Sequence, residues 1–355
     1  MTKEFGKAMI YPVIALRKLE KPVVRRAPEG AFRYLWKYKG GGEMKKKRFL
    51  TYEEQIVFLR DKKKLEIQDV EYAKSILFKT GYFPLINGYK ESFKDTETNQ
   101  FQKGVSFEDI YELYRFDNDL RSIFIKYILM VERNVKSSLA YQFCLAYGDM
   151  QEDYLNPKHY DYAGKKKAVI NTMLKIMSGQ VRSDSDYAYV RHYIEKYKYV
   201  PLWVLLNVLT IGQLSKIYSC QKGRVKIRIC QDFGPIKVNE MGKMLAVMTK
   251  FRNVCAHNDR LFDFRTKDAV LDMNIHERLL LSKVNGRYEY GKNDLFAQLI
   301  ILKLLLPEDE FKAFYHDLKL CFQKHPVHKE ILDKMGFPEN WERIGRIKKY
   351  TKKEL

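Results

Sequence analysis

Arg252, Asn253 and His257 are the residues whose types and spacing are best suited to chemistry in this chain. They lie in the string FRNVCAHN, residues 251–258. On a regular α-helix a five-residue step turns by about 140°, so Arg252 and His257 would face different directions, whereas Asn253 and His257 would share a face. A site that uses both Arg252 and His257 therefore requires the helix to end or bend near His257, or a second copy of the motif to face the first.

The chemistry that this trio can support is RNA cleavage by transesterification. A ribose 2′-OH attacks the adjacent 3′ phosphate, and no metal is needed. A histidine that titrates near neutral pH can act as general base or acid. An arginine fork stabilises charge on a phosphorane better than a lysine does. The products would carry a 2′,3′-cyclic phosphate and a 5′-OH.

The elements that must position these residues are predicted to be helices. Apolar residues recur at three- and four-residue intervals from Asp109 to about Tyr147, a run long enough that we expect it to bend, and Gly148 should end it. Val238–Phe251 repeats the pattern, with methionines on a stripe that is more typical of a core than of a cofactor site.

Local signals predict the remaining elements. Thr51 and Glu54 form a capping-box pattern, a second helix runs from about Asp69 to Gly81, and Ser106 precedes the long run. Asn285-Gly286 predicts a hairpin turn within Val284–Tyr290. Further helices are predicted at Leu202–Val208, Gly212–Tyr218, Leu295–Leu306 and Glu308–Phe322. The predicted fold class is all-α with at most one small β-hairpin.

The composition predicts a polyanionic partner. The chain has 65 Lys+Arg against 44 Asp+Glu, a formal net charge of +21, and residues 1–48 hold fourteen basic and four acidic side chains. Gly40–Gly42 indicate a break near the end of this basic arm. Its cations are interleaved with aromatic residues, which favours an RNA-contacting arm over a solvated tail. The arm residues expected to bind RNA are Arg25, Arg26, Arg33, Trp36, Lys45, Lys46, Lys47 and Arg48.

Other classes of protein are disfavoured by the pattern. No apolar stretch is long enough to span a membrane, and Arg17 and Lys18 follow the first apolar segment where a signal peptide would have small residues. The five cysteines and seven histidines show no metal-binding spacing, so we expect neither a metal nor a cofactor. We expect a cytoplasmic protein.

The string from Arg252 to His257 resembles the Arg-polar-x-x-x-His motif of the HEPN superfamily, with Asn253 in the polar position. The resemblance implies an all-α helical bundle that forms a homodimer, in which two motifs make a composite site. A tyrosine two residues after the histidine, found in the modification-controlled toxin variant of the motif, is absent here, since Asp259 occupies that position.

A wider resemblance links the chain to Abi-like (abortive infection) proteins of the AbiD/AbiF type. Five segments carry it in order: 49–55, 81–89, 116–134, 200–204 and 252–261. It implies a role in anti-phage abortive infection, an association of some members with a small non-coding RNA, and a relationship to the nuclease domains of type VI CRISPR effectors. The domains expected are a basic arm (1–48), an N-terminal helical region (49–104), a HEPN-like helical domain (105–270) and a C-terminal region of hairpin and helices (271–355).

Three further polar residues, Asp117, Glu132 and Asn134, are expected near Arg252. Glu132 is predicted to orient Arg252 through a charge-assisted contact, the alternative being an exposed helix charge. Arg133 is a candidate phosphate contact, or else an ordinary surface arginine.

The leading hypothesis is an RNA-binding HEPN protein of abortive infection that cleaves RNA without metal. The alternative is a non-catalytic RNA-binding protein that holds a structured RNA. A DNA-binding regulator also fits the charge, but the sequence shows no recognition-helix or zinc signature.

Overall fold

The structure is a computed structural model that describes residues 48–325 and 327–350. The described residues from Leu50 onward form one compact unit. The fold is all-α, as predicted, and the sheet that it contains in the described part of the chain is the hairpin of β1 (Lys283–Val284) and β2 (Arg287–Tyr288). Asn285 and Gly286 both have positive φ, +49° and +75°, which is the backbone that the predicted tight turn requires. The finer division of residues 49–355 into three regions stays a prediction.

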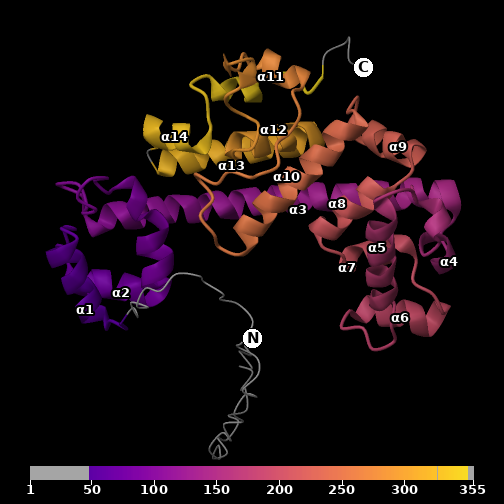
Figure 1. Cartoon of the computed structure of the whole chain (residues 1–355), viewed down its shortest axis with the longest axis horizontal. Helices are drawn as coiled ribbons and strands as arrows, with labels where there is room; N and C mark the ends of the chain where they lie inside the picture. The colour runs from indigo at the N-terminus through magenta and orange to yellow at the C-terminus, as the bar shows by residue number, and fades with distance from the viewer. Residues whose placement is uncertain (1–47, 326, 351–355) are drawn as a thin grey trace, which may run out of the picture. The chain divides into compact units, whose positions relative to one another are not determined.

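The central element is α3 (Phe107–Tyr147), a helix of 41 residues (Figure 1). Ser106 begins it with a capping box, in which its hydroxyl accepts the Asp109 N–H and the Asp109 carboxylate accepts the Ser106 N–H. Gly148, with φ +101°, ends it. The expected bend does not interrupt this run. The helix contains neither glycine nor proline, and other helices pack along it from end to end.

Helix α10 (Val238–Ala256) packs against α3 and against α8 (Ile211–Cys220). The predicted methionine stripe is confirmed as core, because Met241, Met244 and Met248 are completely buried. Helix α10 is the element that carries the motif, and α3 is the surface on which it rests.

Helix α9 (Gly223–Phe233) was not predicted, and it is fixed to α3 by a polar contact. The Asp232 carboxylate accepts hydrogen bonds from Ser138 Oγ at 2.6 Å and from Gln142 Nε2 at 3.1 Å. Val225, Ile227 and Ile229 alternate with Lys226 and Arg228, and this two-residue spacing hides the helical periodicity.

Two C-terminal helices cover α3 and α10. Every residue of α12 (Leu295–Leu305) is buried, and α13 (Glu308–Lys324) lies along α3 (Figure 1). The Phe314 ring meets the rings of Phe124 and Tyr127 edge-on, with centroids 5.3 and 5.2 Å apart. Residues 295–324 are therefore part of the core that supports α3.

The remaining helices flank this core. In the view of Figure 1, α5, α6 and α7 lie on one side of α3 and α12 to α14 on the other. Their bounds are α1 (Tyr52–Val57), α2 (Val70–Thr80), α4 (Gln151–Tyr154), α5 (Lys166–Gln180), α6 (Ala188–Tyr197), α7 (Leu202–Val208), α11 (Asn274–Arg278) and α14 (Lys329–Met335). None of the helices in the described ranges is long and apolar enough to cross a lipid bilayer.

Candidate functional site

The motif lies at the C-terminal end of α10. The helix ends at Ala256, and His257, with φ −96° and ψ 6°, is its C-cap. The His257 N–H still donates to the Asn253 carbonyl at 3.0 Å. Asn258 then adopts φ +57°, a left-handed conformation that asparagine tolerates, and the chain reverses. A helix end at His257 is one of the arrangements that would let Arg252 and His257 serve one site.

The three motif side chains differ in exposure. Asn253 and His257 are exposed, whereas Arg252, which follows the buried Phe251, is half-buried. The buried Nε atom of Arg252 has no hydrogen-bond partner among residues 48–325 and 327–350, and no carboxylate there pairs with its guanidinium. A cation that is partly desolvated and not neutralised by the protein is suited to bind an anion such as a phosphate.

Asp117, on α3, holds the segment that follows the motif. Its side chain is completely buried, and it accepts backbone hydrogen bonds from Leu261 N–H at 3.0 Å and from Phe262 N–H at 2.7 Å. The hydroxyl of Tyr89 donates a third hydrogen bond at 2.7 Å. Burial raises the pKa of the Asp117 carboxyl, while the guanidinium of Arg121 and the backbone donors oppose this rise.

Arg121 completes this buried network one helical turn after Asp117. It donates to the Asp117 carboxylate at 2.5 Å, to the Tyr89 hydroxyl at 3.1 Å and to the Asp259 carbonyl at 3.3 Å. The Asp259 carbonyl lies two residues beyond His257, so the ion pair on α3 fixes the backbone directly after the motif. Because the pair is buried, removing one partner would leave a charge without compensation.

The aromatic segment 81–89 also supports the reversal of the chain that follows His257. It contains a π-helical turn, Phe83–Asn87, followed by Gly88 and the buried Tyr89. Tyr89 stacks on Phe262 with ring centroids 6.1 Å apart, and Arg260 donates to the Gly88 carbonyl and to Asp263 Oδ1. Two of the segments that carry the family resemblance therefore meet at the motif.

The other predicted supporting residues do not contact the motif. Glu132 pairs with Lys136 on the same helix at 2.8 Å, and in the described part of the chain no hydrogen bond or ion pair joins it to Arg252. The predicted Glu132–Arg252 contact is therefore wrong. Asn134 lines a separate cavity with Tyr141 and Asp232, and Arg133 is exposed.

Of the predicted RNA-binding arm, only Arg48 is within the described residues, where it is exposed. Arg25, Arg26, Arg33, Trp36, Lys45, Lys46 and Lys47 lie outside them.

Sequence reasoning missed Tyr89, Arg121 and Arg260 as residues that position the motif. For Arg121 a signal existed, because Asp117 and Arg121 are spaced i, i+4 on a face of α3 that is otherwise apolar, and a charged pair on such a face is expected to be buried and matched.

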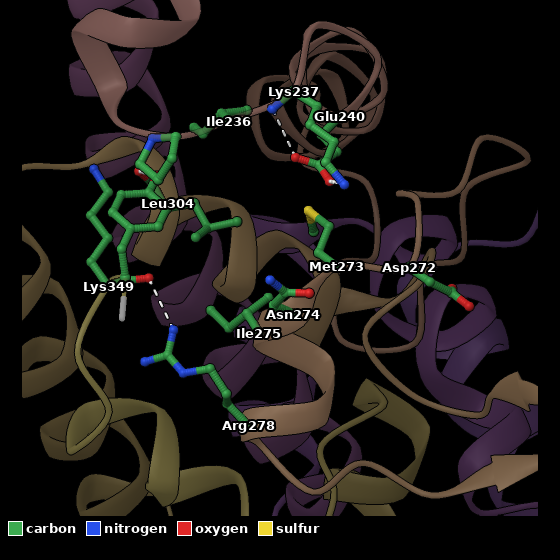
Figure 2. Close-up of a pocket in the computed structure, with 12 residues that line it drawn as sticks. Ile236, Lys237, Glu240, Asp272, Met273, Asn274, Ile275, Arg278, Leu304 and Lys349 are labelled. Carbon is green, nitrogen blue, oxygen red and sulfur yellow. Dashed lines mark hydrogen bonds and ion pairs between the residues drawn. The ribbon is translucent and has the colours of Figure 1, made fainter. Parts of the chain in front are cut away.

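Two cavities lie away from the motif. One, of about 240 Å³, is lined by residues such as Lys237, Asp272 and Arg278 (Figure 2). Lys349 also lines it, and burial lowers the pKa of this amine to about 8. A second cavity, of about 650 Å³, lies beside His325. Neither includes the motif, whose exposed side chains offer an open surface that suits a polymer better than an enclosed small molecule.

Comparisons with known proteins gave a match to a protein family over the region that contains the motif. No match was found among curated proteins, and none among solved structures. A family model described as Abi-like protein matches residues 75–263, which is more than half of the chain. The matched range includes α3, the motif helix α10 and the residues whose backbone N–H groups donate to Asp117. The chain therefore belongs to the Abi-like protein family.

Proposed function

We propose that this chain is a metal-independent endoribonuclease of abortive infection, with Arg252 and His257 as its catalytic residues and Asn253 as a polar contact for substrate. One observation carries the proposal most directly. Arg252 is half-buried with no protein partner among the described residues, five positions before an exposed histidine at a helix end. The membership of the Abi-like family supports the role in abortive infection.

In the proposed reaction, a neutral imidazole of His257 accepts the proton of a ribose 2′-OH. The 2′ oxygen then bonds to the adjacent phosphorus, and the bond from phosphorus to the 5′ oxygen breaks. An imidazolium returns a proton to the leaving 5′ oxygen, which gives a 5′-OH and a 2′,3′-cyclic phosphate. The guanidinium of Arg252 stabilises the negative charge that develops on the phosphorane oxygens.

The base and the acid of this scheme need not come from one chain. A HEPN-type homodimer would bring two copies of the motif together, so that one His257 acts as base and the other as acid. The position of His257 at the end of α10 supports this arrangement, since an exposed helix end is accessible to a second copy.

The proposed partners are RNA molecules, either a small non-coding RNA, a target RNA, or both. The formal net charge of +21 supports a polyanionic partner. A non-catalytic RNA-binding protein is the second candidate, and the concentration of basic residues in 1–48 favours it, because binding through that arm needs no reacting group.

Incubation of the purified full-length chain with a labelled, unstructured RNA in excess chelator distinguishes the two candidates. The nuclease proposal predicts a downstream fragment with a 5′-OH and an upstream fragment whose 3′ end can be extended only after its cyclic phosphate is removed. Tight RNA binding with intact RNA would instead support the non-catalytic alternative. Parallel titration of a DNA of the same sequence at fixed salt tests the DNA-binding reading, which would require equal or tighter binding of DNA.

A further inference from the structure

A group of cations lies far from the motif, on two connecting segments of the chain. One segment leads from α3 to α5, and the other leads from α8 to α9. A backbone bridge between Tyr160 and Gln221, and a 2.9 Å hydrogen bond from the Asp161 N–H to the Cys220 carbonyl, bring the starts of α5 and α9 side by side. We call this region the α5/α9 surface. Its cations are Lys166, Lys167, Lys222, Arg224 and Lys226.

These cations greatly outnumber the carboxylate that pairs with them. Asp161 binds Lys166 at 2.5 Å, and Lys166, Lys226 and Lys222 all lower its pKa. Burial, followed by the repulsion of Lys166, lowers the pKa of Lys226. Asp161 therefore balances only part of the positive charge of these five cations.

Several of these cations lie at helix N-termini, where acidic side chains are usually preferred. The N-terminus of a helix carries a partial positive charge that favours acidic side chains. Neither α5 nor α9 has an acidic residue in its first turn, and Lys165 and Lys222 occupy their N-cap positions. The lysines at these two adjacent helix N-termini repel the partial positive charge of each helix and one another. A phosphate bound between them would relieve this repulsion.

Aromatic rings accompany the cations. Tyr147 and His159 form a parallel stack with ring centroids 4.6 Å apart and planes at 6°. Lys222 lies 5.8 Å from the Tyr147 ring, and Lys167 lies 5.7 Å from the ring of Tyr162, which is exposed. Alternation of cations with aromatic faces matches the alternation of phosphates and unpaired bases in a single strand.

We propose that the α5/α9 surface is a second binding site for single-stranded RNA, separate from the motif. Its cations contact phosphates, and Tyr162 stacks on a base. The inference rests on the proposed function, in that the RNA held here is the RNA presented to Arg252 and His257.

The separation of the two sites sets the length of RNA that can reach both. Asp117 marks the motif end of α3 and Tyr147 marks the other, thirty residues away, which is about 45 Å along a helix. At about 3.4 Å per nucleotide, the spacing along a fully stacked strand, this distance corresponds to roughly 13 nucleotides. A hexanucleotide therefore occupies one site at a time, whereas a 30-nucleotide strand can occupy both.

The test compares two charge-matched variants of the full-length chain. Lys167→Gln, Lys222→Gln and Arg224→Gln together remove three exposed cations from the surface, and Lys62→Gln, Lys103→Gln and Lys312→Gln remove three exposed cations elsewhere. Fluorescence anisotropy with an unstructured 30-nucleotide RNA is measured over a series of salt concentrations. Thermal melting confirms that each variant is folded.

The surface variant should bind the 30-nucleotide RNA at least tenfold more weakly at 0.1 M salt. Its slope of log affinity against log salt should be smaller by about 2, since each phosphate contact contributes about 0.7. Tyr162→Leu should lower affinity about tenfold without changing the slope, because stacking releases no counterions. The control variant should stay within twofold of the unmodified chain. Equal affinities and slopes for the surface and control variants would overturn the proposal.

Cleavage of a hexanucleotide separates this proposal from the nuclease proposal. The surface variant should cleave it at the unmodified rate, because the short RNA does not need the second site. If the unmodified chain cleaves no RNA, the nuclease proposal fails, while the anisotropy comparison still decides whether the α5/α9 surface binds RNA.

Discussion

The Oδ1 atom of Asp117 accepts a 2.7 Å hydrogen bond from the backbone N–H of Phe262, a residue 145 positions further along the chain. This contact joins the N-terminal part of the long helix α3 to the segment that follows the motif. Because Arg121 neutralises Asp117 and also reaches the Asp259 carbonyl, one buried ion pair fixes the backbone on which His257 depends. The arrangement links the stability of the core to the geometry of the candidate site.

Asp117→Asn should destabilise the fold strongly. The amide retains the size of the side chain but leaves the Arg121 guanidinium buried without a counter-charge, and breaking a buried ion pair costs about 3–5 kcal/mol. Chemical denaturation should show a lower midpoint with an unchanged slope. Asp61→Asn is a suitable control, because that carboxylate forms a surface pair with Arg60 and its loss should change the free energy of unfolding by less than about 0.5 kcal/mol. A similar effect of both variants would contradict the account of Asp117.

Arg252→Met should separate function from stability. The methionine keeps an apolar stem of similar length and removes a buried Nε atom that has no partner in the described residues, so the free energy of unfolding should change by less than about 1 kcal/mol. The rate of RNA cleavage should fall by about 10²–10³, the usual loss when a group that stabilises the transition state is removed. Arg252→Lys should restore only part of the rate, because a lysine lacks the planar fork. Strong destabilisation of Arg252→Met would instead indicate a structural arginine.

Asn258 should tolerate glycine better than a branched residue. Its φ of +57° lies in the left-handed region, where a β-branched side chain costs about 1–2 kcal/mol. Asn258→Val should therefore lower the denaturation midpoint, because valine strains the reversal after His257. The same strain should displace His257 and lower the cleavage rate. Asn258→Gly should leave the midpoint nearly unchanged. Equal midpoints for the valine and glycine variants would show that this turn does not constrain the motif.

Asp294, the N-cap of α12, should make stability depend on pH. Burial raises its pKa to about 6, against about 3.9 in an unfolded chain. The folded state therefore holds this proton more tightly, so the contribution of Asp294 is complete below about pH 4 and is lost as the pH rises through 6. The loss is of the order of 3 kcal/mol for a shift of about two pH units.

The comparison of the unmodified chain with Asp294→Asn isolates this contribution from other titrating groups. The difference in free energy of unfolding, unmodified minus variant, should fall between pH 4 and 6.5. A difference that stays constant over this range would show that Asp294 does not titrate there.

Local signals in the sequence predicted the starts of α1, α2 and α3. Thr51, Asp69 and Ser106 each cap a helix with the side chain that the pattern indicates, because capping involves residues only three positions apart. The same holds for the hairpin turn at Asn285-Gly286. Helix α9 was missed because its buried residues are few and lie between cations.

Long-range contacts were not predictable in the same way. Asp117 was expected near the motif, and it does contact the following segment, but through the backbone of Leu261 and Phe262 instead of through Arg252. Glu132 was placed wrongly because its partner depends on how α3 and α10 are rotated against each other, which helical periodicity within one segment does not specify. The role of Tyr89 was not predictable either, because it depends on the packing of segment 81–89 against α3 and against the segment that follows α10.

The most direct test of the central claim is the rate at which His257→Ala cleaves a single-stranded RNA in the presence of chelator. His316→Ala is the matched control, because His316 is an exposed histidine on α13 away from the motif. The account predicts that His257→Ala loses cleavage while it keeps RNA affinity within about twofold, and that His316→Ala cleaves at the unmodified rate. Cleavage by His257→Ala at the rate of the unmodified chain would contradict it.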